Sequence, residues 1–144
     1  MPIVAAVDQS DSTSDVLTEA EALATATGEP LHVVHVLTRK KFREIEQTSV
    51  EETGTAVPME EVRSFATKIA DEAAEGVVSE YEPIGLVGDP ADGLLNYIET
   101  NDIRYIVLGG RKRSAVGKAI FGSTAQPVLM DASCPVVTVT RDES

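Results

Sequence analysis

The sequence contains no tryptophan, one cysteine and few aromatic residues, which make up 4% of its 144 residues. With Cys134 alone, the chain can form neither an internal disulfide nor a metal cluster built on cysteines. This is typical of proteins that function in a reducing cytoplasm. We interpret Cys134 itself as a small apolar side chain of the core.

Long hydrophobic runs are also absent. A helix that crosses a membrane needs about 18 or more apolar residues, whereas the first apolar run spans only Ile3 to Val7 and follows no basic segment. The sequence therefore predicts neither a membrane span nor an export signal. We expect a cytoplasmic protein without a membrane partner.

Basic residues are scarce, because 12 Lys and Arg stand against 24 Asp and Glu, giving a net charge of −12. Proteins that bind nucleic acids need a cationic face, so we expect no nucleic-acid partner. An acidic excess is also common in proteins from high-salt cytoplasms. A halophilic source is therefore a hypothesis, which solubility in dilute salt would test.

Apolar residues, 42% of the chain, recur in patterns that alternate between strands and helices. Short β-rich apolar runs predict strands that are buried on both faces. Stripes at helical spacing predict helices between them. The expected strands cover residues 3–7, 31–37, 84–87, 105–108 and 135–140. The expected helices cover residues 12–28, 58–81, 90 to about 98, and 123–132.

Local signals mark several of these boundaries. Ser12 with Asp15 resembles a capping box, and Asp89 before Pro90 predicts a capped helix start. Residues 38–57 are polar and lack sustained periodicity, which predicts an irregular segment with a short helical turn near Phe42. Residues 109–122 are rich in glycine and basic side chains, which predicts a loop.

Strands that alternate with helices predict one α/β domain over residues 1–144. Its five-stranded parallel sheet would be doubly wound, with helices on both faces. In such sheets, ligands bind beyond the carboxyl ends of the strands, where the strand order reverses. The loops after the first and fourth strands are therefore the expected ligand-binding segments.

The loop after the fourth strand carries a spaced glycine pattern. Gly109 is followed, after twelve residues, by Gly122-Ser123-Thr124. This spacing resembles that of ATP-binding members of the universal stress protein family, which have Gly, two residues, Gly, nine residues, then Gly and Ser or Thr. Further resemblance lies in Ala6-Val7-Asp8-x-Ser10, in residues 31–36 and 88–90, and in Cys134-Pro-Val-Val.

The resemblance implies a flavodoxin-like (Rossmann-like) sheet of order 3-2-1-4-5 and a stress-response or regulatory role. It implies an adenine nucleotide, ATP or AMP/ADP, with the base near Asp8 and Val36 and the phosphates on residues 109–124. It also implies a homodimer formed through the fifth strand and an unknown protein partner. The expected binding residues are Ala6, Val7, Asp8, Ser10, Val36, Leu108, Gly109, Arg111, Lys112, Gly122, Ser123 and Thr124.

Charge and backbone chemistry are compatible with a phosphate-bearing ligand. Glycines allow the backbone to approach phosphates closely, and backbone amides at a helix N-terminus can donate to an anion. Eight of the 12 basic residues fall in two segments expected at the same sheet edge, which would attract an anion. They are Arg39, Lys40, Lys41, Arg43, Arg111, Lys112, Arg113 and Lys118.

Three alternatives remain open on the sequence. Lys112 replaces the second glycine of the family pattern, and its side chain both adds bulk and disfavours a positive φ. This allows an ATP-independent member that acts by dimerisation and partner binding. A second alternative is an enzyme that slowly hydrolyses ATP, for which the sequence offers no evident base to activate water. Asp8 could bind Mg²⁺ with the nucleotide or only form a turn, whereas His32 and His35 face opposite sides of one strand and cannot share a metal.

Overall fold

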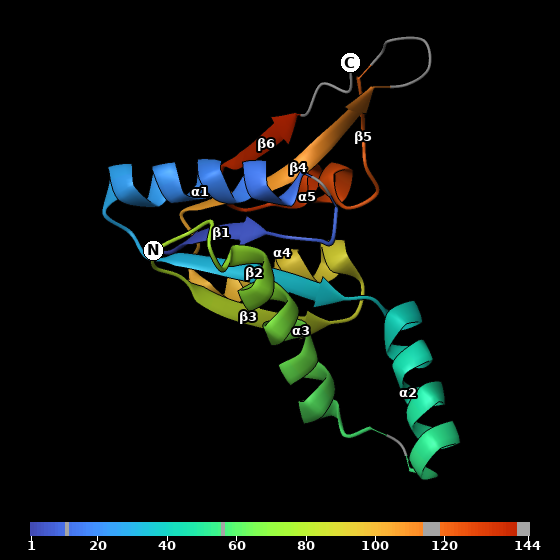
Figure 1. The fold of residues 1–144 in the computed structure, drawn as a ribbon. Helices are drawn as coiled ribbons and strands as arrows, with labels where there is room; N and C mark the ends of the chain where they lie inside the picture. Colours follow the sequence, from blue (N-terminus) through green and yellow to red (C-terminus); the bar gives the residue numbers. More distant parts are fainter. Residues whose placement is uncertain (11, 56, 114–118, 141–144) are drawn as a thin grey trace.

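The computed structural model describes residues 1–10, 12–55, 57–113 and 119–140. Its central parallel sheet contains β1 (Ile3–Ala6), β2 (Leu31–Leu37), β3 (Glu82–Val87), β4 (Tyr105–Arg113) and β6 (Val136–Thr140), in the order β3-β2-β1-β4-β6 (Figure 1). This confirms the predicted five-stranded parallel sheet. A short strand, β5 (Ala119–Phe121), adds to β4 in the antiparallel direction.

Helices cover both faces of the sheet because alternate strand residues point to opposite sides. On one face, Ile3 and Ala5 pack with buried residues of α1 (Thr13–Thr27) and α3 (Met59–Ala74). On the other face, Val4 packs with α4 (Pro90–Asn101) and α5 (Ala125–Asp131). The two apolar layers explain why the strands read as continuous apolar runs.

The predicted helix boundaries hold in some places and fail in others. Asp89 caps α4, since its Oδ1 accepts the backbone N–H of Asp92 at 3.0 Å. Ser12 precedes α1 but makes no side-chain capping hydrogen bond, so the capping-box prediction is wrong. The helix expected over 58–81 ends at Ala74, because the chain turns at Gly76 with φ +82°.

The segment expected to be irregular forms α2 (Arg39–Thr53), a helix of 15 residues. Thr38 caps it by accepting the backbone N–H of Lys41 at 3.2 Å, and Gly54 ends it in the left-handed conformation. No α2 residue is buried. The prediction failed because a helix without a buried face lacks the apolar periodicity that marks most helices.

The expected loop over residues 109–122 is also partly regular. β4 continues to Arg113, and its last residues pair with β5, with Lys112 opposite Ile120. Residues 114–118 of that segment, including Lys118, lie outside the described residues. Among the described helices, none is both long and apolar enough to cross a membrane.

Candidate functional site

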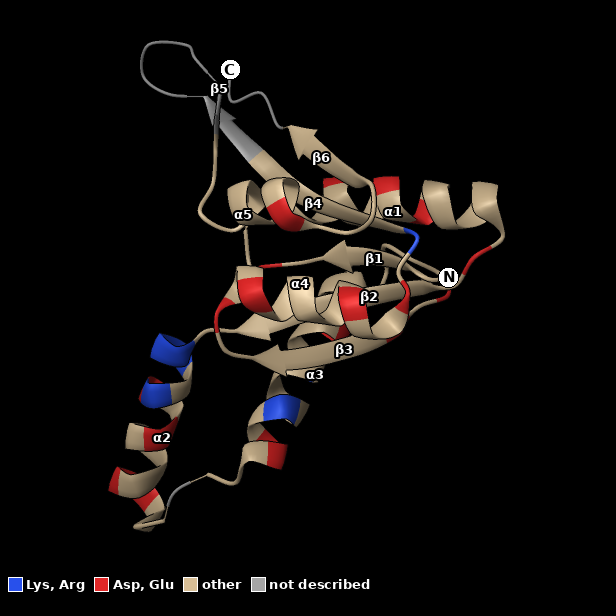
Figure 2. Cartoon of the chain, turned by 180° about the vertical axis from the view of Figure 1, so that it is seen from behind, with Lys and Arg blue, Asp and Glu red and all other residues tan. Residues whose placement is uncertain are grey.

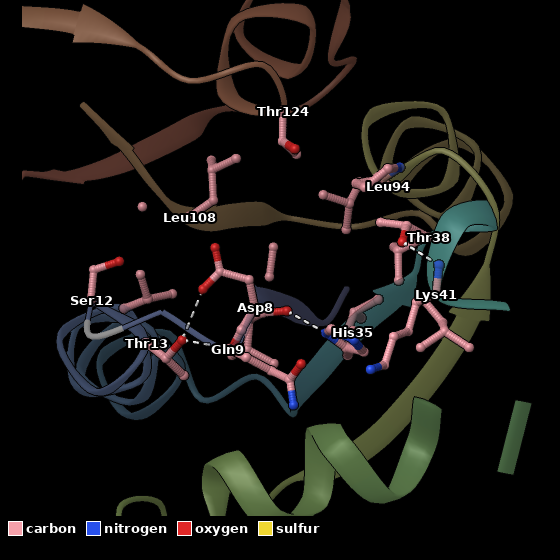
Figure 3. A pocket seen from close by; sticks show the side chains of 18 residues that line it. Asp8, Gln9, Ser12, Thr13, His35, Thr38, Lys41, Leu94, Leu108 and Thr124 are labelled. Carbon is pink, nitrogen blue, oxygen red and sulfur yellow. Dashed lines mark hydrogen bonds between the residues drawn. The ribbon is translucent and has the colours of Figure 1, made fainter. Parts of the chain in front are cut away.

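A cavity of about 310 Å³ lies at the carboxyl ends of β1, β2 and β4. This is the edge at which the strand order reverses, because β1 leads to β2 on one side and pairs with β4 on the other. Figure 3 shows the side chains that line it. They are Ala6, Val7, Asp8, Gln9, Ser12, Thr13, Val16, Val34, His35, Val36, Leu37, Thr38, Lys41, Pro90, Leu94, Leu108, Gly109 and Thr124.

Asp8 follows β1 and is fixed by hydrogen bonds to one carboxylate oxygen. Its Oδ1 accepts the backbone N–H of Ser10 at 2.9 Å, the Ser10 hydroxyl at 2.5 Å and the Thr13 hydroxyl at 3.2 Å. Thr13 also donates to the Asp8 carbonyl oxygen at 2.9 Å. These contacts tie Asp8 to the start of α1, and Figure 3 shows its carboxylate at the cavity.

The same contacts keep Asp8 ionised. Partial burial by itself raises the pKa of this carboxyl group. The hydrogen bonds from Ser10 and Thr13, together with the nearby His35, lower the pKa by more than burial raises it, so the net pKa is below the ordinary value. An ionised carboxylate only accepts hydrogen bonds. Asp8 therefore offers the cavity an acceptor and a negative charge.

His35 belongs to β2, lines the same cavity as Asp8 and is 8% exposed. Its Nδ1 lies 2.9 Å from the carbonyl oxygen of Val7. A carbonyl oxygen only accepts, so this contact places the ring hydrogen on Nδ1. The bond links the end of β2 to the residue before Asp8 and holds the turn that presents Asp8.

The side of the cavity beyond β2 is formed by the beginning of α2. Thr38 and Lys41 line the cavity there, and Lys41 also lies 3.7 Å from the carboxylate of Glu44. Figure 3 shows the Lys41 side chain on the opposite side of Asp8 from Thr13. Of the side chains that the structure describes, the cavity is therefore bordered by the cationic Lys41 and the anionic Asp8.

The opposite wall comes from β4 and the segment before α5. Leu108 and Gly109 end the part of β4 that borders the cavity, and Thr124 precedes α5. A Cβ on Gly109 would lie 3.0 Å from the Ser12 hydroxyl oxygen, so the Ser12 side chain would have to shift by a few tenths of an ångström. Glycine at this position leaves room for the Ser12 side chain between the two walls.

The structure brings some of the predicted binding residues to the cavity and places others elsewhere. Ala6, Val7, Asp8, Val36, Leu108, Gly109 and Thr124 line it. Ser10 does not line the cavity, but its hydroxyl donates a hydrogen bond to Asp8, which does. Gly122 and Ser123 also lie outside it, and the Gly122 N–H donates to the Gly110 carbonyl at 2.9 Å.

Arg111 and Lys112 belong to the extended end of β4, and their side chains lie outside the described residues. The sequence argument against a lysine rested on a positive φ at position 112. Because Lys112 lies in a β-strand, its backbone does not adopt the left-handed conformation that favours glycine. The backbone part of the objection therefore does not hold, whereas the part that rests on the bulk of the lysine stays a prediction.

Sequence reasoning omitted several lining residues from the binding set. His35, Thr38, Lys41 and Leu94 come from β2, α2 and α4. The basic cluster containing Lys41 was expected at this edge, but its place in a helix was not. His35 gave no usable signal, because its role depends on contact with a residue 28 positions away.

Whether the cavity could hold a metal ion depends on the side chains grouped around it. Among the described residues, no three His, Cys, Asp or Glu side chains are grouped so that they could hold a metal ion. At the cavity, Asp8 is the carboxylate available to a cation that enters with a ligand. An open parallel sheet with helices on both faces and a cavity at its switch point places the protein in the class of doubly wound α/β proteins.

Sequence comparison identifies the family within this class. A sequence model of the universal stress protein family matches residues 1–140. A universal stress protein of Thermus aquaticus is 33% identical over 144 residues, covering 95% of this chain and 96% of its own length. The chain belongs to the universal stress protein family.

Solved structures agree with this assignment. The universal stress protein from Archaeoglobus fulgidus is 36% identical, with a TM-score of 0.61 and coverage of 96% of this chain and 97% of its own. A structure of the Archaeoglobus fulgidus protein in complex with dAMP is 30% identical, with a TM-score of 0.57 and coverage of 96% of both chains. The hypothetical protein MJ0577, 20% identical with a TM-score of 0.72 over 99% of this chain and 97% of its own, shares the fold.

Proposed function

We propose that the cavity binds an adenine nucleotide, ATP or AMP/ADP, and that the bound nucleotide controls a cytoplasmic stress-response module. The observation that carries the proposal is the fixed carboxylate of Asp8 in a cavity that also contains Val36, Gly109 and Thr124. The dAMP complex of the Archaeoglobus fulgidus protein supports it, since that protein is 30% identical over 96% of both chains.

Asp8 would recognise the adenine base by its hydrogen-bond polarity. The 6-amino group of adenine donates, whereas the oxygen at the same position of guanine accepts. An ionised Asp8 can only accept, so at position 6 of the base it accepts from adenine and faces an acceptor in guanine. The donors of guanine, N1–H and the 2-amino group, lie at other positions of the ring edge, so a base held in the adenine pose is selected. The apolar side chains of Val36, Leu94 and Leu108 supply surfaces against which a flat base can pack.

The phosphates would lie toward Gly109 and Thr124, where a hydroxyl and a close backbone are available. Mg²⁺ would enter with a di- or triphosphate, and Asp8 is the cavity residue that could join its ligands. Three donors already occupy Asp8 Oδ1. This favours recognition of the base by Asp8 over direct metal binding.

Calorimetric titration with ATP, AMP and GMP, with and without Mg²⁺, tests the proposal. Asp8→Asn places a donor beside the 6-amino group, so we expect adenine nucleotides to bind about 10- to 100-fold more weakly. The discrimination against GMP should shrink in the same variant. Asp15→Asn, which changes an exposed carboxylate of α1, is the matched control.

Two results would contradict nucleotide recognition by Asp8. One is saturable ATP binding that Asp8→Asn leaves unchanged, and the other is GMP binding as tight as AMP binding in the natural sequence. A complete lack of nucleotide binding would instead favour the ATP-independent alternative. The cavity volume, at the lower end of the range for ligand sites, gives that alternative its support.

In either case we propose a homodimer formed through β6 and an unidentified protein partner. β6 pairs with β4 on one side and is the last strand of the sheet on that side. A strand at a sheet edge presents backbone groups that a second copy can pair with.

A further inference from the structure

Helix α2 stands apart from the rest of the molecule. Figure 1 shows it projecting from the end of β2, and none of its residues is buried. Its inner side is partly covered, because Phe42 and Ile45 pack against the small cluster formed by Leu37, Val62 and Ala66. The remaining surface of α2 is open to a partner.

The charges of α2 are separated along its length (Figure 2). All four basic residues lie in 39–43, and all four acidic residues lie in 44–52. The first turn therefore has no acidic residue and the last turn no basic residue. This order opposes the helix dipole, which favours negative charge at the N-terminus and positive charge at the C-terminus. The isolated helix is destabilised by its own charge order.

The outer side of α2 carries a shallow groove lined by Arg43, Glu46, Gln47, Val50 and Glu51. Arg43, Gln47, Val50 and Glu51 follow one another at spacings of four, three and one, so they share a helix face. Val50 is 48% exposed within this groove. Among the described residues, the ion pair made by α2 joins Lys41 and Glu44. Glu51 Oε1 accepts a hydrogen bond from Gln47 Nε2 at 3.4 Å, within the same face. Glu51 keeps its negative charge in this contact, so Arg43 and Glu51 can each pair with an opposite charge on a partner.

We propose that this outer face pairs with the same face of a second copy, with the two α2 helices antiparallel and Gln47 near the two-fold axis. Residues four positions either side of Gln47 then face each other, so Arg43 lies opposite Glu51 of the partner subunit. The two-fold axis repeats this contact with the roles reversed. In the antiparallel pair, the basic N-terminal half of each helix lies beside the acidic C-terminal half of the other. The charges of one helix therefore compensate the unfavourable charge order of the other.

A second copy fits this face better than a partner of one charge sign. The whole chain carries −12, but α2 has equal numbers of basic and acidic residues. The face therefore does not repel itself, whereas an acidic or a basic segment would meet like charge at one end. This pairing involves neither the nucleotide cavity nor the edge of β6, so it is independent of the proposed function.

Disulfide trapping tests the pairing directly. Gln47→Cys is introduced in a Cys134→Ser background and oxidised with copper phenanthroline at micromolar protein. We expect a disulfide-linked dimer, and much less of it in molar NaCl because exposed ion pairs are screened. Glu99→Cys, on an exposed position of α4, is the matched control. A Gln47→Cys yield no greater than that of this control would overturn the proposal.

Charge reversal identifies the contact that holds the pair. Arg43→Glu makes the face acidic and Glu51→Arg makes it basic, and each should reduce the trapped dimer about tenfold. Both changes improve the charge order of α2 relative to its dipole, so helix loss cannot explain the reduction. Mixing the two variants should restore a trapped heterodimer, as should combining both changes in one chain. Equal yields in all these samples would exclude the antiparallel register.

Discussion

Tyr81, just before β3, shows how one contact can couple stability to pH. Its hydroxyl donates to Asp71 Oδ1 at 2.6 Å. This hydrogen bond, with partial burial and the negative charges of Asp71 and Glu75, raises the pKa of Tyr81 to about 12, above the ordinary value of a tyrosine. The folded state therefore holds the phenol proton more tightly than the unfolded chain does.

The stabilisation from Tyr81 should be complete below pH 10 and lost as the pH rises through about 12, because the folded-state pKa is the higher one. We expect Tyr81→Phe to have a lower free energy of unfolding than the natural protein near neutral pH. The difference in free energy of unfolding between the two proteins should become smaller above pH 10. Urea unfolding at several pH values measures this, with absorbance titration of the tyrosines. A difference that does not change between pH 8 and pH 12 would contradict the assignment.

At the scale of elements, the contact between α3 and β3 depends on Gly85. A Cβ built on Gly85 would overlap the backbone nitrogen of Thr67 and lie 2.5 Å from the carbonyl oxygen of Arg63. Both atoms belong to the α3 backbone, so the helix itself would have to move away from the strand. The small residue at this position lets the helix lie directly on the sheet.

We therefore expect Gly85→Ala to reduce the free energy of unfolding by about 2–3 kcal/mol, as overpacking against a rigid neighbour does. Chemical denaturation measures the loss. Gly122→Ala is the matched control, because a Cβ there meets no atom within 4 Å, and its effect should stay within about 0.5 kcal/mol. Equal losses in the two variants would show that α3 adjusts freely.

At the scale of the whole molecule, the net charge of −12 opposes the compact state through self-repulsion. Figure 2 shows acidic residues on helices of both sheet faces. Raising KCl from about 0.1 M to about 1 M shortens the screening length from about 10 Å to about 3 Å. We expect a gain of about 1 kcal/mol, or roughly 3 °C in the unfolding midpoint.

Differential scanning calorimetry at the two salt concentrations checks this expectation. At an acidic pH, where fewer carboxylates are charged, the salt effect should shrink because less repulsion remains to be screened. A midpoint that does not depend on KCl at pH 7 would show that the acidic residues are too widely spaced to interact.

The sequence alone determined the order of the main strands and helices, since runs such as Ile3–Ala6 must be covered on both faces. It also determined local features such as the Asp89 cap, whose partner is three residues away. It placed Asp8 and Gly109 at one sheet edge, because parallel strands bring their carboxyl ends together.

Other features were decided only by the tertiary structure, because they depend on contacts between distant segments. His35 holds the turn before Asp8 through Val7, a contact that crosses from β2 to β1. Helix α2 has no buried residue, so its pattern could not reveal it, yet it brings Lys41 to the cavity. The continuation of β4 to Arg113 depends on pairing with β5, which the glycine-rich, basic composition concealed. Burial periodicity in the sequence reports which residues face the core, whereas pairing between distant segments decides which polar groups meet.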